Sequence, residues 1–144
     1  MRTAERSTTL KQPPAAVFAF LADIGNLPRW QAGVTRAEQT SPGPVAVGTT
    51  AVVERRLMGQ GIQADLRVTR FDPDRAIVLE TDASGVHVEA SIRLEPMEPD
   101  GCRVTFGMAI EATNVFMRPL EAMVAQAAEG DIGASLEALR RALG

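Results

Sequence analysis

His87 is the first candidate for proton chemistry, because it is the chain's single histidine and an imidazole ordinarily titrates near pH 6.5. It lies in a segment, residues 86–95, whose apolar and polar residues alternate. Val88 belongs to the apolar set, whereas His87, Glu89 and Arg93 belong to the polar set. A strand with this period has one buried and one solvated face. We therefore expect His87 on the solvated face, away from any internal site.

Arg55 is the second candidate, in the predicted strand at residues 49–57. In one register, Ala51 and Val53 face inward and bring Arg55 with them; the other register places Thr50, Val52, Glu54 and Arg56 inside. We favour the first. An inward guanidinium can anchor a carboxylate or enolate oxygen through charge-assisted hydrogen bonds. The alternative is a surface arginine, or one held in a structural ion pair.

Other reactive groups are few. The chain has no tyrosine, so the phenolic hydroxyl groups that many cavity enzymes use as acids and oxyanion donors are absent. Cys102 is the single cysteine, which excludes an internal disulfide, and it has no cysteine or histidine at metal-ligand spacing. We interpret it as a buried, unreactive thiol. No phosphate-binding loop, dinucleotide fingerprint, zinc-protease motif or nucleophile elbow is present, and we predict neither a cofactor nor a metal.

The elements that must position these residues form an α+β pattern. Pro13 and Pro14 suit the start of a short helix over residues 15–23, and residues 27–30 predict a second short helical turn. Strands are expected at residues 4–11, 34–40, 49–57, 62–71, 86–95 and 104–110. Gly, Pro, Asp and Asn mark the turns between them. The sequence predicts a curved antiparallel sheet of six or seven strands.

A long helix is predicted over residues 115–143, about 42 Å at 1.5 Å per residue. Its apolar stripe is expected to cover the sheet and consists of Phe116, Leu120, Met123, Val124, Ala127, Ile132, Leu136, Leu139 and Leu143. Gly130 and Gly133 each cost roughly 1 kcal/mol relative to alanine inside a helix. Close packing on the sheet or a bend is the favoured reason, and a hinge is the alternative.

The length and the net charge of the chain limit the number of domains and the kinds of partner that we expect. At 144 residues the chain fits one domain, 1–144. The net charge of −3 gives no electrostatic footprint for nucleic acid. Neither a signal peptide nor an apolar run long enough to span a membrane is present, so we expect a cytoplasmic location. The polar N-terminal strand favours a monomer or a weak homodimer.

The segment PPAAVFAFLADIGNLPRW (13–30) resembles the opening pattern of the START-like and polyketide cyclase–dehydrase superfamily, also called SRPBCC. Residues 47–54, 71–80 and 100–108 are similar to later landmarks of that superfamily. The resemblance implies a helix-grip fold with a cavity between the sheet and the long helix. It also implies that Trp30 lies near the cavity mouth. We expect Asp23 to cap the junction between the short helices.

Three functions follow from the resemblance: binding of an apolar small molecule such as a lipid or polyketide, cyclisation or dehydration of a polyketide, and contact with a partner protein. Binding ranks first. Ten buried ligand methylenes gain about 8 kcal/mol. Since association costs about 4 to 15 kcal/mol, a polar anchor such as Arg55 is needed.

Methionine side chains adapt to variable apolar shapes, so we expect some of them to contact the ligand. The expected ligand-contacting residues are Trp30, Arg55, Val88, Phe106, Met108, Phe116, Met117, Leu120 and Met123.

Overall fold

The computed structural model describes residues 1–57, 59–83 and 85–143, with the side chains of all of these except Leu57 and Ala83. Its β-strands are β1 (Arg2–Leu10), β2 (Val34–Gln39), β3 (Thr50–Leu57), β4 (Gln60–Asp72), β5 (Ala76–Ala83), β6 (Val86–Met97) and β7 (Gly101–Ala112). They form one seven-stranded antiparallel sheet. The predicted sheet is therefore confirmed, at the upper end of the expected strand number.

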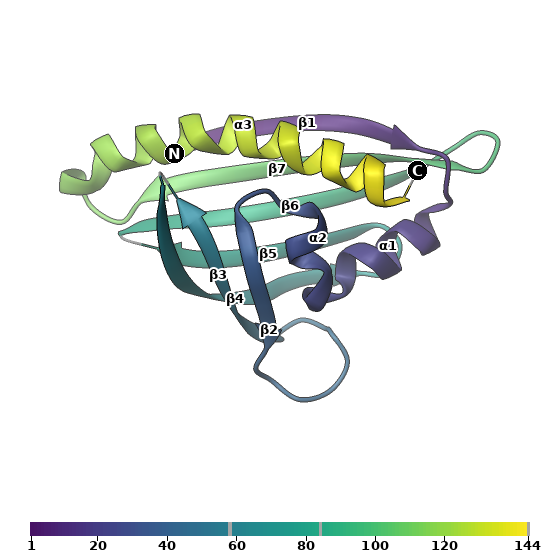
Figure 1. The fold of residues 1–144 in the computed structure, drawn as a ribbon, viewed down its shortest axis with the longest axis horizontal. Coiled ribbons are helices and arrows are strands. Elements are labelled where there is room, and N and C mark those ends of the chain that lie inside the picture. The colour runs from purple at the N-terminus through teal and green to yellow at the C-terminus, as the bar shows by residue number, and fades with distance from the viewer. Residues whose placement is uncertain (58, 84, 144) are drawn as a thin grey trace.

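The order of strands across the sheet is β1-β7-β6-β5-β4-β3-β2. From β2 to β7 each strand pairs with the next one in the chain, and β1 then pairs with β7. Register shifts bend β2 between Val34 and Arg36, and β4 between Val68 and Arg70. The resulting sheet curves around its inner face, on which the helices lie (Figure 1).

Two short helices follow β1, as predicted: α1 (Pro14–Ala22) and α2 (Leu27–Trp30), joined by the 3-10 turn η1 (Ile24–Asn26). Pro13 is the N-cap of α1 and Pro14 its first residue, where the missing amide hydrogen costs nothing. The Asp23 side chain accepts a hydrogen bond of 3.0 Å from the Gly25 amide. Asp23 therefore caps the junction, in agreement with the sequence interpretation.

The long helix α3 (Arg118–Leu143) follows the 3-10 turn η2 (Val115–Met117) and runs beside β1 and β7 (Figure 1). Its 26 residues span about 39 Å. Glu121 Oε2 accepts a hydrogen bond of 2.8 Å from the Ala112 amide, and Ser135 Oγ accepts one of 2.8 Å from the Ala32 amide. These contacts fix α3 against the end of β7 and against the segment after α2.

The inner face of the sheet and α3 share one apolar core. The predicted alternation in β6 is confirmed: Val86, Ala90 and Ile92 are buried, whereas Glu89 on the other face is exposed. Helix α3 contributes Val124, Ala128, Ile132, Leu136 and Leu139 to this core, and its Ser135 is also buried. None of the helices in the described part of the chain combines the length and the apolar composition of a membrane-spanning segment.

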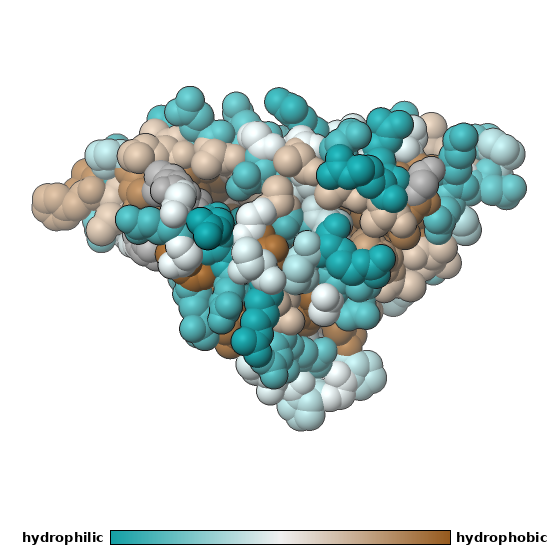
Figure 2. Space-filling model, viewed as in Figure 1, coloured by the Kyte–Doolittle hydropathy of each residue, from teal (hydrophilic) through white to brown (hydrophobic). Residues whose placement is uncertain are grey.

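The start of α3 corrects the predicted helix. The regular helix begins at Arg118 rather than at residue 115. Phe116 is 87% exposed and Met123 is 54% exposed, so the predicted inward orientation of these two side chains is wrong. These two side chains are exposed because of where they lie. Both η2 and the outward side of the first turns of α3 project beyond the sheet and cannot cover it. Figure 2 shows apolar side chains gathered at this end of the molecule.

Candidate functional site

Two small adjoining cavities lie on the inner face of the sheet. Both are lined by Arg55, Thr81, Val88 and Met108. Each encloses about 30 Å³ of space that the centre of a water molecule can reach. That space suffices for about two waters per cavity. The site therefore consists of two adjoining small openings in a mostly closed core rather than one large ligand chamber.

The first cavity lies between the sheet and α3. Its further lining residues are Ile62, Ala64, Val86, Ile110, Val124, Ala128 and Asp131. The second cavity extends toward α2 and β2, with Gln31, Val34, Val53, Leu66, Leu79, Glu80 and Ala90. Aliphatic side chains dominate both linings, and the polar groups come from a few positions on different elements. This composition is typical of sites that bind largely apolar molecules.

Arg55 is the cationic group of the site. Ala51 and Val53, two and four residues earlier on β3, are buried, which confirms the favoured register. The Arg55 Nε atom is buried and has no hydrogen-bond partner among the described residues. Burial lowers the pKa of Arg55, and the charge of Asp131 opposes this shift. Even so, a guanidinium remains charged in proteins. The site thus presents a charged donor that is not fully hydrogen-bonded.

Asp131 faces Arg55 from α3 and completes the polar part of the first cavity. Burial raises the pKa of Asp131, and the Arg55 charge opposes the rise. Within the described residues, the two groups make no ion pair of 4.0 Å or less. The structure therefore places a cation and an acid on opposite walls of an apolar cavity, coupled by charge but separated in space.

Sequence reasoning missed Asp131 and Thr81. A signal for Asp131 was present, because it lies three residues after Ala128 and four before Ser135, both buried on α3. An acid at this spacing shares the inner side of a helix. Thr81 follows Ile77 and Leu79 at a period of two on β5, which places it on their face.

Three of the nine predicted ligand-contacting residues line the cavities: Arg55, Val88 and Met108. Trp30 and Phe106 lie nearby in the core, 2% and 1% exposed, with their rings edge to face at 5.5 Å. Neither belongs to the described lining of the two cavities. The Trp30 Nε1 atom is buried and, within the described part of the chain, has no hydrogen-bond partner. Their large rings fill the core beside the site.

The other four predicted residues lie near the start of α3, outside the described linings of both cavities. Leu120 is partly buried and packs against the core. Met117 is also partly buried and lies under Gly85, where an added Cβ would be 2.9 Å from the Met117 Cγ. Phe116 and Met123, together with Val115 at 62% exposure, form an exposed group that we call the apolar end.

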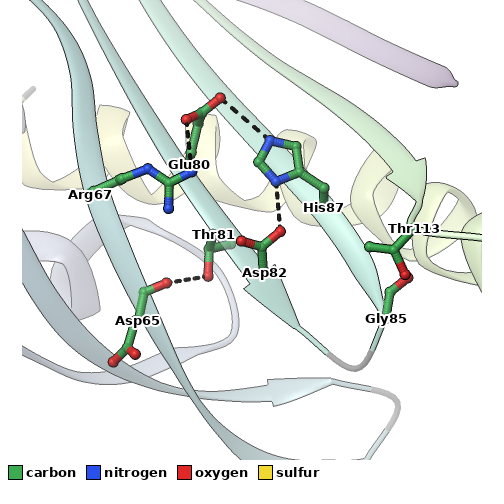
Figure 3. A network of polar contacts seen from close by, with 8 residues as sticks. All are labelled: Asp65, Arg67, Glu80, Thr81, Asp82, Gly85, His87 and Thr113. Carbon is green, nitrogen blue, oxygen red and sulfur yellow. Dashed lines mark hydrogen bonds and ion pairs between the residues drawn. The ribbon is translucent and has the colours of Figure 1, made fainter.

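The outer face of the sheet carries a polar network around His87, and one member of this network, Glu80, also borders the second cavity (Figure 3). His87 Nδ1 lies 2.7 Å from Asp82 Oδ1, and His87 Nε2 lies 3.4 Å from Glu80 Oε1. Glu80 also receives a hydrogen bond of 3.3 Å from Arg67. The hydrogen bond to Asp82 is the main cause that raises the pKa of His87. The predicted outward position of His87 is confirmed, and both ring nitrogens already have partners.

Cys102 is fully buried, and burial raises the pKa of its thiol. The sequence interpretation of a buried thiol is confirmed. Among the described residues, no group of three or more His, Cys, Asp and Glu side chains is placed to hold a metal ion. The polar residues in the described linings of the two cavities are Arg55, Asp131, Thr81, Gln31 and Glu80, and the other lining residues are apolar.

Comparison with protein families gives one match over the whole chain. The sequence model of the family described as "Polyketide cyclase / dehydrase and lipid transport" matches residues 1–144. An uncharacterised protein of Mycobacterium tuberculosis, Rv2574, is 35% identical over 101 residues. That alignment covers 67% of this chain and 58% of the relative, so the chain spans less than two thirds of the relative's length.

Solved structures share the fold. A START superfamily protein from Mycobacterium smegmatis superposes with a TM-score of 0.77 at 12% identity, covering 99% of each chain. The Zhui aromatase/cyclase from Streptomyces sp. R1128 superposes with a TM-score of 0.73 at 20% identity, covering 98% of this chain and 95% of that one. At these identities the likeness establishes the helix-grip architecture, and function must be argued from the site.

Proposed function

This chain belongs to the polyketide cyclase/dehydrase and lipid transport family, and we propose that it binds an apolar small molecule, such as a lipid or a polyketide, between the sheet and α3. In this proposal Arg55 anchors a carboxylate, carbonyl or enolate oxygen of the ligand. The observation that carries it is the buried Arg55 Nε, which lacks a hydrogen-bond partner among the described residues and lies beside an apolar lining.

The energetic argument rests on that unpaired donor. A buried polar group without a partner costs about 1 to 3 kcal/mol, and more when it is charged. A ligand oxygen that accepts from Arg55 would recover this cost on binding. The aliphatic walls would add about 0.8 kcal/mol for each ligand methylene removed from water. A mostly apolar ligand with one oxygen-bearing end satisfies both parts of the site.

Binding requires the cavities to widen, because two spaces of about 30 Å³ hold waters rather than a lipid. The walls offer two ways to do so. Met108 is unbranched and lines both cavities, so a change of rotamer would join them. Val124 and Ala128 belong to α3, whose displacement would open the first cavity toward solvent.

Binding is tested with N-phenyl-1-naphthylamine, an uncharged apolar dye that fluoresces when it leaves water. We expect saturable one-to-one binding by the wild-type protein. Ala128→Leu fills the first cavity and should abolish it, whereas Ala134→Leu, at an exposed position of the same helix, should not. Circular dichroism checks that both variants are folded. No binding by the wild type, or equal binding by both variants, would contradict the proposal.

A cyclase or dehydratase is the second candidate. It is favoured by the presence of a cation and an acid in one apolar cavity, since these groups can polarise a carbonyl and transfer a proton. The likeness to an aromatase/cyclase supports it at the level of fold. Incubation with a linear polyketide analogue should then give turnover that falls by about 100-fold or more in Arg55→Met or Asp131→Asn. Recovery of the analogue intact after binding would contradict the enzyme candidate and leave ligand binding as the function.

A partner-binding module is the third candidate, and the apolar end favours it. Exposed Val115, Phe116 and Met123 lie close together in sequence at the start of α3. Replacement of all three by serine should leave dye binding unchanged and weaken any association measured by analytical ultracentrifugation. The same experiment on the wild type tests the predicted monomer or weak homodimer. Fractionation of the source cells tests the predicted cytoplasmic location.

A further inference from the structure

We propose that an acidic ligand enters the cavity together with one proton, which Asp131 takes up from solvent as the ligand's anionic group pairs with Arg55. The inference rests on the proposed binding function and adds to it the class of ligand and the pH dependence of the site. It makes Asp131 a group that adjusts the charge of the cavity rather than a direct ligand contact.

The charge balance of the first cavity is the starting point. Among its described lining residues, the ionisable groups are Arg55 on the sheet and Asp131 on α3, and all the others except Thr81 are apolar. With both groups ionised, the empty cavity is neutral. An anion bound to Arg55 leaves one uncompensated negative charge in apolar surroundings. Such a charge is costly, and protonation of a carboxylate is the least costly way to remove it.

The charged groups on strand β5 beside the cavities and on the elements that contact α3 leave Asp131 as the group that adjusts. On β5, Glu80 is bonded to Arg67 and His87, so its charge is already compensated. On β1, the Arg6 guanidinium lies next to Gly133, 3.0 Å from the position of an added Cβ. Strand β7 presents the apolar Met108 and Ile110 to the cavity. On α2, Arg29 lies over the Phe20 ring instead.

The direction of the effect follows from the causes that act on Asp131. Burial raises its pKa and the Arg55 charge lowers it. An anion that pairs with Arg55 cancels part of the lowering, so the pKa of Asp131 rises on binding. Protons are therefore taken up wherever the pH lies between the two values. In that range the affinity for an anionic ligand increases as the pH falls.

The test compares two probes with one ring system. 8-Anilinonaphthalene-1-sulfonate carries a sulfonate that stays ionised, whereas N-phenyl-1-naphthylamine lacks it. We expect sulfonate affinity to rise as pH falls from 8 to 4, by up to tenfold per unit, while affinity for the neutral dye stays flat. Calorimetry in two buffers of different ionisation enthalpy should count up to one proton taken up. Asp131→Asn should flatten the profile, and Glu129→Gln, exposed on the same helix, should not.

The outcomes separate the two proposals. Absence of neutral-dye binding would overturn the proposed function. Binding of both probes with no proton uptake at any pH, or with an unchanged profile in Asp131→Asn, would overturn the proton coupling alone. Should Asp131→Asn fail to fold, carbon NMR of the wild-type carboxylates decides the question. The Asp131 carboxyl must move toward its protonated shift when the sulfonate binds, and an unmoved signal would contradict the inference.

Discussion

The two faces of the sheet treat charged side chains differently. On the outer face, His87, Glu80 and Arg67 are joined by contacts of 3.3 to 3.4 Å, and Asp82 holds the remaining ring nitrogen of His87 at 2.7 Å. On the inner face, Arg55 shares a cavity with Asp131 of α3, and the two make no direct ion pair. The outer groups satisfy one another, whereas the Arg55 Nε lacks a partner within the described residues.

The difference between paired charges outside and an unpaired donor inside indicates which face of the sheet contacts a ligand. A histidine between two carboxylates resembles a catalytic group. The hydrogen bonds of His87, however, link β6 to β5 and occupy both ring nitrogens. Buried polar groups are usually paired, so an unpaired one needs an explanation. The less conspicuous inner pair is therefore the better candidate for ligand contact. Four predictions test the contrast.

The largest expected effect concerns packing on the inner face. Ile132 is a fully buried residue of α3, and Ile132→Ala should lower the free energy of unfolding by roughly 2 to 5 kcal/mol. Glu89→Ala, at an exposed position on the outer face, should change it by less than about 0.5 kcal/mol. Urea denaturation measures both. Equal losses would mean that the core does not lie between the sheet and α3.

The next effect concerns the two arginines. Arg55→Met should weaken binding of 8-anilinonaphthalene-1-sulfonate by about tenfold to a hundredfold, because a charged hydrogen bond contributes about 1.5 to 3 kcal/mol. Binding of the uncharged dye should be kept. Arg67→Met removes the outer contact to Glu80 and should alter neither affinity by more than about twofold. Fluorescence titration measures both, and a larger loss in Arg67→Met would reverse the assignment of the site.

A smaller effect separates the two glycines of α3. Gly130 has open space around it, so Gly130→Ala should stabilise the protein by about 0.5 to 1 kcal/mol. At Gly133 an added Cβ would lie 3.0 Å from Arg6 Nη1, so Gly133→Ala should gain less. Thermal unfolding gives the comparison. A larger gain at Gly133 would show that contact with the Arg6 side chain is not the reason for that glycine.

The smallest effect belongs to the outer network. The pKa of His87 in the folded state is raised, chiefly by Asp82. The stabilisation that protonated His87 gives the folded protein is therefore fully present below the pKa of His87 in the unfolded state. It disappears as the pH rises through the folded value. His87→Gln should therefore cost about 0.5 kcal/mol near pH 5.5 and less near pH 9, since the partly exposed contacts are screened by solvent. A pH series of urea denaturation checks this, and a cost that grows with pH would contradict the sign.

Much of the fold was predictable because it depends on periodicity. Alternation in β6 placed His87 outside, and buried neighbours on β3 placed Arg55 inside. The ends of the long helix were less predictable. An apolar stripe predicts which side of a helix is buried, but it does not predict where the sheet beneath the helix ends. The stripe therefore predicted an inward orientation for Phe116 and Met123, although both side chains are exposed.

The candidate site was predictable only in part. Arg55, Val88 and Met108 follow from strand phase, whereas the partnership of Arg55 with Asp131 joins positions far apart in the chain. No local pattern records which strand a given turn of α3 will cover. Trp30 lies in the core and outside the described linings of the two cavities, and its contact with a ligand stays a prediction, because a tryptophan suits a core position as well as a place in a cavity wall.

The most direct test is methyl NMR of the methionines during titration with N-phenyl-1-naphthylamine. Met108 lines both cavities, and Met123 belongs to the apolar end, so the two methyl groups report on the competing sites. Substitution of each by leucine assigns its signal. Binding between the sheet and α3 predicts a large shift of the Met108 methyl and an unmoved Met123 methyl. A shifted Met123 with an unmoved Met108 would contradict it and assign the dye to the exposed end of the molecule.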